Sequence, residues 1–306
     1  MIVDERPSGS IMAQVNNKHH QDLEIKPRHM DFPFGSLKSM KFFDNNIYKS
    51  AFVAQLSATF PVGEAEFLNS VRNLRKEVKN EKLLKQMRGF IGQEGHHSNQ
   101  HQKINKELDR LGYDTNSIHL KLKEIIDKKI NKMSHKFRLA YTASAEHFTA
   151  IMAEHSLRDE SFLDGMEAPM QDLLYWHAVE EIEHKAVAFD VYMECFGDTK
   201  FLHRIMKLLI VTLHLRMGSY TFKMAFNSPH WKSWSEFKDA MSWMFGKGGV
   251  WRSLRGPYRE FYRKNFHPWA NGGYELIDVW DKKHARAEQN RANPDYVPST
   301  ASATAL

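Results

Sequence analysis

Two glutamate–histidine pairs, each three residues apart, are the residues of this sequence best placed to do chemistry. Glu94 and His97 form one pair, and Glu181 and His184 form the other. Residues three apart lie on one side of a helix. Both pairs stand where an amphipathic helix carries apolar residues, so the sequence predicts that they face the core. Burying carboxylates and imidazoles is costly unless each is paired or bound to a metal.

Two further glutamates are predicted to face the same interior. Glu146 lies on a stripe of small residues, which leaves room for a bulky group, and Glu64 follows Pro61 at the start of a predicted helix. Glu64 and its neighbour Glu66 could also simply complement the dipole of that helix. The chain order Glu, Glu-x-x-His, Glu, Glu-x-x-His is the ligand plan of a carboxylate-bridged two-metal site in a four-helix bundle.

The donor types indicate which metals such a site would hold. Carboxylates with a few imidazoles favour iron, then manganese, over zinc, and the single cysteine, Cys195, lies about three turns beyond His184. We expect two divalent ions roughly 3.5–4 Å apart. His101, His177 and Glu180 are additional candidates, because the two histidines continue the inward stripes and Glu180 adjoins the second pair.

The elements that must position these residues are predicted to be helices. The predicted fold is all-α, because sustained alternation of apolar and polar residues is missing from the sequence. The ligand plan makes it a four-helix bundle, with additional C-terminal helices. Residues 46–285 are expected to form one metal-binding domain, with a bundle core over 46–198 and a helical cover over 199–285. A flexible lead-in over 1–45 and a disordered tail over 286–306 flank it.

Within that domain the periodic patterns set approximate helix limits. The predicted helices cover about 47–79 with an interruption at 60–63, 81–111, 117–158 with a break near 133–134, 168–195 and 199–226, followed by short helices in a Trp-rich segment. Gly89, Gly92 and Gly95 form a small-residue line that suits the close approach of a neighbour. The helix over 199–226 is interpreted either as a fifth bundle helix or as a membrane-surface helix.

Composition and charge exclude several classes of protein. The chain has 306 residues, a net charge of +6 and one cysteine, so it carries no internal disulfide framework. No signal peptide or membrane-spanning run is predicted, which favours a cytoplasmic protein with, at most, a peripheral contact at the inner membrane face. The basic residues accompany no nucleic-acid-binding motif, so nucleic acid is not an expected partner. A homo-oligomer is compatible with the sequence.

Several short blocks of the sequence resemble a known bacterial family, described as predicted metal-dependent hydrolases. The blocks are Phe60–Glu64, Gln93–His97, Ala145–Ala150, Trp176–Lys185 and Phe266–Trp269, and they occur in family order over roughly residues 30–285. The resemblance implies a ferritin-like, dimetal helical protein. It also implies metal-site roles for Glu64, Glu94, His97, Glu146, Glu181 and His184, with Glu64 preferred over Glu66.

Three functions are compatible with this site. The leading hypothesis is a non-haem di-iron oxidoreductase that uses dioxygen, and an electron donor, on a small organic or lipid-like substrate. The first alternative keeps the site but makes it a metal-dependent hydrolase in which a metal-bridging hydroxide is the nucleophile. The second is a non-catalytic metal-binding or membrane-peripheral helical protein. The Trp-rich C-terminal third favours an apolar substrate, because such a segment can cover the site and exclude water.

Overall fold

The described part of the chain is all-α. The structure is a computed structural model, and it describes residues 22–278 and 280–282. Within these ranges the β-type pairing is an isolated bridge between Phe43 and Met166. The predicted tail over 286–306 and residues 1–21 of the predicted lead-in lie outside the described residues.

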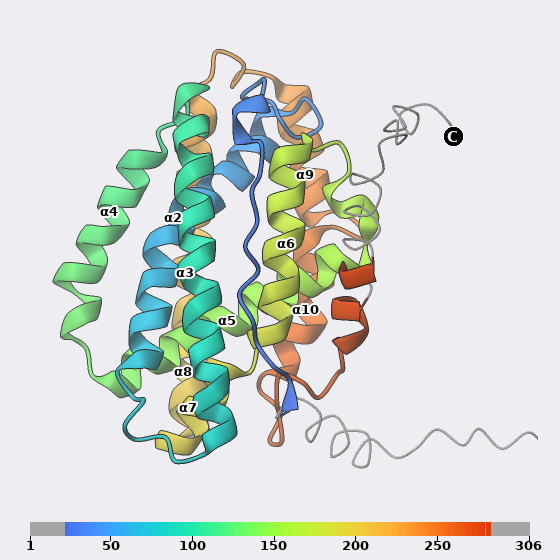
Figure 1. The fold of residues 1–306 in the computed structure, drawn as a ribbon. Helices are drawn as coiled ribbons and strands as arrows, with labels where there is room; N and C mark the ends of the chain where they lie inside the picture. The colour runs from blue at the N-terminus through green and yellow to red at the C-terminus, as the bar shows by residue number, and fades with distance from the viewer. Residues whose placement is uncertain (1–21, 279, 283–306) are drawn as a thin grey trace, which may run out of the picture.

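Four helices surround the predicted site (Figure 1). They are α2 (Ile47–Arg72), α3 (Glu81–Arg110), α5 (His135–Arg158) and α6 (Ala168–His184). Helices α2 and α6 each pack against both α3 and α5, which closes a ring of four. Outside this ring, α4 (Thr115–Lys128) packs on α2 and α3, and α8 (Thr199–Phe226) packs on α2 and α5. This packing supports the interpretation of α8 as a fifth bundle helix.

Polar residues cap most of these helices and explain where they begin. Asn46 accepts hydrogen bonds from the backbone of Tyr48 and Lys49 at the start of α2. Such a side-chain acceptor satisfies amide groups that have no partner within the helix. Four other helices are capped in the same way: α3 by Asn80, α4 by Asp114, α5 by Ser134 and α8 by Asp198.

Helix α2 runs without interruption through Pro61, so the predicted break at 60–63 is wrong. A proline inside a helix removes the hydrogen bond to the carbonyl four residues earlier, here that of Ser57. The side-chain amide of Asn105 on α3 donates to this carbonyl at 3.0 Å. A neighbouring helix therefore replaces the missing bond, and Glu64 lies within a long helix rather than at the start of a new one.

The predicted helix over 168–195 is divided into α6 and α7 (Val187–Cys195) directly after His184. No proline or glycine marks this point in the sequence. The Lys185 ammonium donates to the carbonyl of Gly272 at 2.8 Å and lies 4.0 Å from the centre of the Trp269 ring. The break coincides with these contacts to the C-terminal segment, which the local sequence does not encode.

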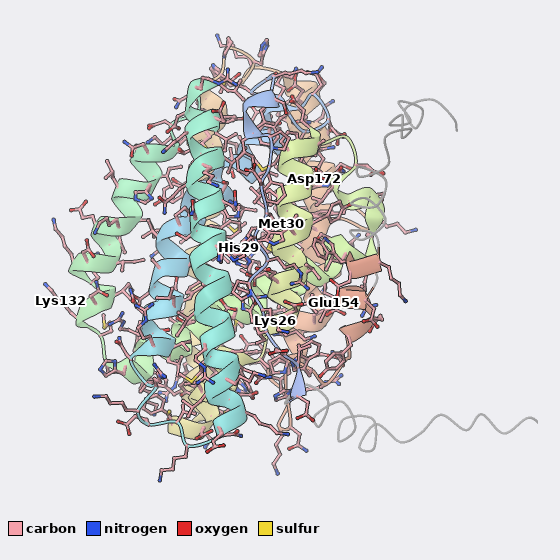
Figure 2. The ribbon with its side chains drawn as sticks, viewed as in Figure 1. Lys26, His29, Met30, Lys132, Glu154 and Asp172 are labelled. Atoms are coloured by element: carbon pink, nitrogen blue, oxygen red, sulfur yellow. The ribbon has the colours of Figure 1, made fainter. Side chains whose placement is uncertain are left out.

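The chain before α2 forms an extended segment that lies between α3 and α6 (Figure 1). Lys26, His29 and Met30 mark its course among the side chains (Figure 2). A Cβ atom on Gly89 would lie 2.3 Å from the carbonyl oxygen of Ile25. Gly89 and Gly92 therefore serve the close approach of Ile25 and Pro27 in the chain's own N-terminal segment, whereas a Cβ atom on Gly95 would meet nothing within 4 Å. This part of the predicted lead-in packs against α3.

The C-terminal third packs on the bundle through its aromatic residues. Helices α9 (Trp234–Phe245) and α10 (Val250–Glu260) precede a loop that contains the Phe266–Trp269 block. Within this block, Nε2 of His267 lies 3.0 Å from a carboxylate oxygen of Asp190 on α7. None of the described helices combines the length and the apolar composition that crossing a membrane would require.

Candidate metal centre

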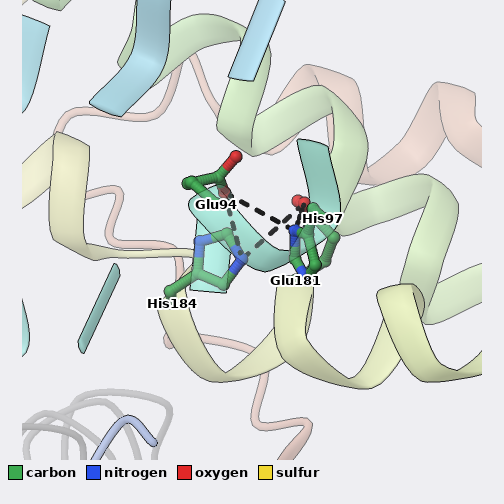
Figure 3. Close-up of side chains that lie close together, drawn as sticks. All are labelled: Glu94, His97, Glu181 and His184. Atoms are coloured by element: carbon green, nitrogen blue, oxygen red, sulfur yellow. Dashed lines mark ion pairs between the residues drawn. The ribbon is translucent and has the colours of Figure 1, made fainter. Parts of the chain in front are cut away.

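The two Glu-x-x-His pairs meet in the interior between α3 and α6. Glu94, His97, Glu181 and His184 are all buried, and one donor atom from each lies within 4.8 Å of the others (Figure 3). Nε2 of His184 lies 3.5 Å from Glu94 Oε1 and 3.7 Å from Glu181 Oε1. Two ligands bound at roughly 2.1 Å to one cation lie about 3–4 Å apart. These four residues therefore have the spacing of a cation site.

A second cluster adjoins the first and comes from three helices. It consists of Glu64 on α2, His101 on α3 and His177 on α6, which are all buried. Nε2 of His101 and Nδ1 of His177 are 2.8 Å apart, and Nε2 of His177 lies 3.8 Å from Glu64. The same Nε2 lies 3.0 Å from Glu181 Oε1, so Glu181 stands between the two clusters.

Glu146 lies beside His184 rather than in either cluster. Its Oε2 is 3.1 Å from Nδ1 of His184, while Nε2 of the same ring faces Glu94 and Glu181. A carboxylate behind a histidine commonly fixes the orientation of the ring that binds a metal through its other nitrogen. The expected set of six ligands is thus distributed over two clusters and one flanking carboxylate, and the ligand roles stay a prediction.

The strongest sign that this interior suits a cation is a group of buried polar atoms without hydrogen bonds. Such atoms are rare in folded proteins because each costs the free energy of its lost hydration. Within the described residues they include both carboxylate oxygens of Glu64 and Glu94, Oε1 of Glu146, Nδ1 of His97 and Nε2 of His184. A positive ion would satisfy these groups together, so the donor set fits a metal.

The pKa shifts of the buried groups also favour a cation at this site. Burial raises the pKa of Glu64 and Glu94 well above the usual range, and neighbouring glutamates raise it further. Burial lowers the pKa of His97 well below its usual value. Burial is the largest effect on Glu181 and His184 too and acts against their charged forms, but several partners together outweigh it. His184, His177 and Thr149 lower the pKa of Glu181, and Glu181, Glu146 and Glu180 raise that of His184 to about 9. A bound cation would replace the protons that the glutamates otherwise hold.

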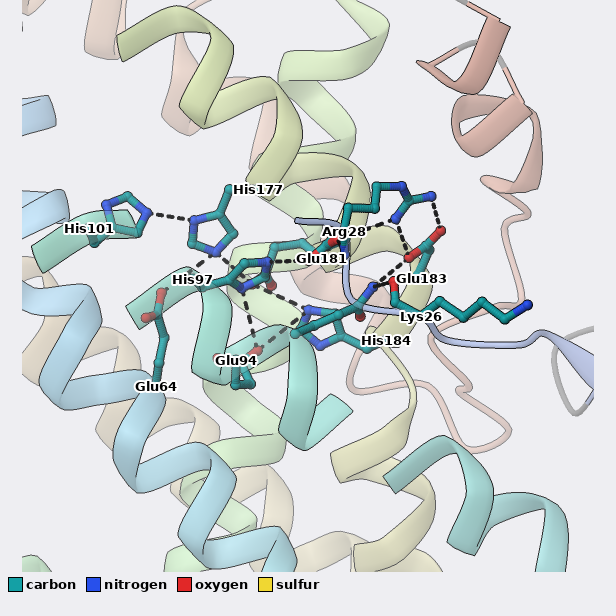
Figure 4. Close-up of polar contacts among 12 residues, drawn as sticks. Lys26, Arg28, Glu64, Glu94, His97, His101, His177, Glu181, Glu183 and His184 are labelled. Carbon is teal, nitrogen blue, oxygen red and sulfur yellow. Dashed lines mark hydrogen bonds and ion pairs between the residues drawn. The ribbon is translucent and has the colours of Figure 1, made fainter. Parts of the chain in front are cut away.

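A network of outer contacts orients His97. Its Nε2 lies 3.0 Å from Oε2 of Glu180, so its Nδ1 is left facing the first cluster. The backbone amide of Arg28 donates to Glu180 at 2.9 Å, and the Arg28 guanidinium binds both oxygens of Glu183 at 2.6 and 2.7 Å (Figure 4). Gln93 donates to Glu183 at 2.6 Å. The N-terminal segment therefore takes part in positioning the site, a role that no sequence motif indicated.

Glu66 has a structural partner of its own. The guanidinium of Arg138 on α5 donates to both of its carboxylate oxygens, at 2.6 and 2.7 Å. Glu64, two residues earlier, has no such partner among the described residues. The preference for Glu64 over Glu66 as a site residue agrees with this difference.

A mainly apolar cavity of about 220 Å³ reaches the candidate centre. Glu64, His177 and Glu181 line it, together with Thr149, whose hydroxyl donates to Glu181 at 2.5 Å. The remaining walls come from α2, α4, α5 and α8 and are dominated by side chains such as Phe52, Leu56, Phe60, Ile125, Ile126, Phe148, Leu209 and Leu213. Helices α4 and α8 thus enclose a cavity with the bundle, and α8 belongs to the walls of this cavity.

The fold and the site together define an all-α protein whose interior carries a carboxylate–histidine centre able to hold a metal. Residues 26–272 match the family described as predicted metal-dependent hydrolases, and the chain belongs to that family. The resemblance seen in the sequence is therefore confirmed. Neither a curated protein nor a solved structure matches the chain.

Proposed function

We propose that the protein is an enzyme that holds two divalent metal ions, one in each cluster. One ion would be held by Glu94, His97, Glu181 and His184, and the other by Glu64, His101 and His177, with Glu181 shared. The observation that carries this proposal is the convergence of these buried carboxylates and imidazoles. Within the described residues, the carboxylate oxygens of Glu64 and Glu94, Nδ1 of His97 and Nε2 of His184 lack hydrogen bonds. Carboxylate and imidazole donors favour iron, with manganese next and zinc least.

The chain's own residues would prepare the centre for reaction. Glu180 fixes the ring of His97, and Thr149 holds one oxygen of Glu181 while leaving the other toward the clusters. The apolar walls of the cavity exclude water and strengthen electrostatic interactions at the centre. When bound, two such ions supply Lewis acidity and, in the case of iron, redox chemistry.

We propose oxidation of an apolar substrate by dioxygen as the reaction. Its support is the combination of a carboxylate-rich donor set with a cavity that is apolar up to the centre, which suits a substrate rich in C–H bonds. Hydrolysis is the second candidate, because it agrees better with the description of the family. Both reactions would use the same residues.

The two reactions are separated by a direct assay. Protein loaded with Fe(II) and supplied with a reductant should consume dioxygen in the presence of medium-chain alcohols, followed with an oxygen electrode. The same preparation, and a Mn(II)-loaded one, should leave nitrophenyl decanoate intact. Ester cleavage by the metal-loaded protein without oxygen uptake would establish the hydrolase instead. A Glu94→Gln variant should lose whichever activity is found, because Glu94 belongs to the first cluster.

We further propose that the outward face of α8 contacts an anionic membrane, from which an apolar substrate would be taken. Leu208, Val211 and Leu215 are exposed on this face, Leu215 to 70%, and Arg204 and Lys207 are exposed beside them. Apolar side chains flanked by cations suit a surface of anionic lipid. The opposite face of the same helix lines the cavity, so the membrane and the cavity would be separated by one helix.

A matched pair of variants tests the membrane contact. Leu215→Glu should weaken co-sedimentation with phosphatidylglycerol vesicles, whereas Leu120→Glu, at a 56% exposed position on α4, should leave it unchanged. High salt should also weaken binding. Equal binding by both variants, or concentration-dependent self-association without vesicle binding, would contradict the proposal.

A further inference from the structure

Gln55 on α2 is a buried amide without a partner. Its side chain is 1% exposed, and neither Oε1 nor Nε2 has a hydrogen bond within the described residues. Leaving a buried amide unsatisfied costs free energy, so a residue of this kind requires an explanation beyond packing. A leucine of similar size would fill the same space without that cost.

Gln55 also lines the apolar cavity that reaches the candidate metal centre. Other polar groups of the lining away from the centre are engaged within the protein. Thr59 donates to the carbonyl of Leu56, Ser156 donates to that of Ala153, and Glu66 is paired with an arginine. Arg216 and Tyr141 also line the cavity and are hydrogen-bonded to each other. Gln55 is therefore a polar side chain of these walls whose amide is left to meet whatever the cavity holds.

The position of Gln55 along α2 sets it well away from Glu64. Gln55, Thr59 and Gly63 recur at intervals of four residues, and all three line the cavity. Glu64 lies nine residues beyond Gln55, which corresponds to a rise of roughly 13.5 Å along a helix. A molecule that extends from Gln55 to Glu64 must therefore be elongated.

We propose that Gln55 binds the polar end of an elongated, otherwise apolar substrate, whose body lies along the cavity toward the metal centre. The amide offers one acceptor and two donors, which match a neutral group that both donates and accepts hydrogen bonds, such as a primary alcohol or a primary amide. A neutral end is favoured because Gln55 is itself uncharged, while the charged side chains of the same walls, Arg216 and Glu66, are already bonded to Tyr141 and Arg138. This inference rests on the proposed function, because it takes the cavity as the substrate site.

Binding by full-length protein as purified, without reductant, tests the inference. Isothermal titration calorimetry with decanol, decanamide and chlorodecane compares two polar ends with one that donates no hydrogen bond. Gln55→Leu should bind the favoured polar probe about tenfold more weakly and bind chlorodecane unchanged. Without ligand, Gln55→Leu should raise the melting temperature, because it removes an unsatisfied amide. Gln171→Leu is the matched control, since this amide already donates to the carbonyl of Leu163 and lies outside the cavity lining, and the variant should bind all three probes as the wild type does.

Several results would overturn the inference. The first is equal affinity of Gln55→Leu and the wild type for the polar probes. The second is a loss of chlorodecane affinity in Gln55→Leu as large as its loss of affinity for the polar probes. The third is failure of the wild type to bind any probe. A lower melting temperature of unliganded Gln55→Leu would show that a bound water already satisfies the amide, which also overturns it. Gln55→Met provides the same comparison if the leucine variant does not fold. Metal binding measured on the same proteins is independent of these results, so failure here is distinguishable from failure of the proposed function.

Discussion

Replacing Arg28 by methionine tests whether the N-terminal segment is part of the site. The guanidinium makes two short hydrogen bonds to Glu183 and lies 3.5 Å from Glu180. The side chains of these glutamates are only 6% and 0% exposed. Methionine keeps much of the apolar stem but removes the charge, so both carboxylates would stay buried without their cation.

The expected loss of stability follows from this burial. Removing one partner of a buried ion pair costs about 3–5 kcal/mol. The Arg28 side chain is 21% exposed, which reduces the loss to about 2–3 kcal/mol in the free energy of unfolding. Urea unfolding of the metal-free protein measures this value. Metal affinity should also fall by about 10- to 100-fold, because Glu180 would no longer hold His97 firmly.

A surface arginine supplies the control. Arg158 binds Glu154 and Glu275 but is 44% exposed, so Arg158→Met should cost less than about 1 kcal/mol. Combining Arg28→Met with Glu183→Gln should recover part of the stability, because the double variant leaves one buried charge fewer. Equal losses for the Arg28 and Arg158 variants would refute the reasoning, as would unchanged metal affinity.

Two further predictions concern individual glutamates. Burial, with the charge of Glu181, raises the pKa of Glu146 from 4.5 to about 7. The folded state then binds more protons than the unfolded state between these values, so metal-free protein should lose on the order of 3 kcal/mol as the pH rises from about 4.5 to about 7. Glu146→Gln should flatten this dependence, and an unchanged unfolding profile would contradict it. Glu66→Gln should lower the melting temperature yet keep the metal content, whereas Glu64→Gln should lose metal. The reverse pattern would show that the two roles had been exchanged.

The sequence predicted the helices that carry the site because their inward stripes are long and regular. The limits of α3, the break before α5 and the limits of α8 follow from periodicity and from caps such as Ser134 and Asp198. The placement of Glu94 and Glu181 in the interior follows from the same stripes. Local pattern sufficed at these positions because helix period and burial agree.

Contacts between distant parts of the chain explain what the sequence did not predict. In the sequence, Pro61 predicts a break in the helix. In the structure, the amide of Asn105, forty-four residues away, replaces the hydrogen bond that Pro61 removes. The division after His184 coincides with a contact to Gly272, and the order of the N-terminal segment depends on glycines of α3. Periodicity within a single helix contains no information about such partners.

The sequence also did not predict that the donor residues divide into two clusters. The sequence analysis gives His101 and His177 as additional candidates beside the Glu-x-x-His residues, because they continue the inward stripes one turn away. In the structure, Nε2 of His101 lies 2.8 Å from Nδ1 of His177. These two histidines form a cluster with Glu64, which comes from a third helix, α2. Helix periodicity predicts which side a residue faces, but the heights at which neighbouring helices align depend on their packing.

The metal content of the purified protein tests the central proposal most directly. Protein prepared without a metal-affinity step, then dialysed against Fe(II) or Mn(II) under nitrogen, should retain two ions per chain by plasma mass spectrometry. Glu94→Gln and His184→Gln should each lose at least one ion, while Glu66→Gln keeps both. Wild-type protein that retains no metal, or equal content in all four proteins, would contradict the assignment of these buried residues to a metal centre.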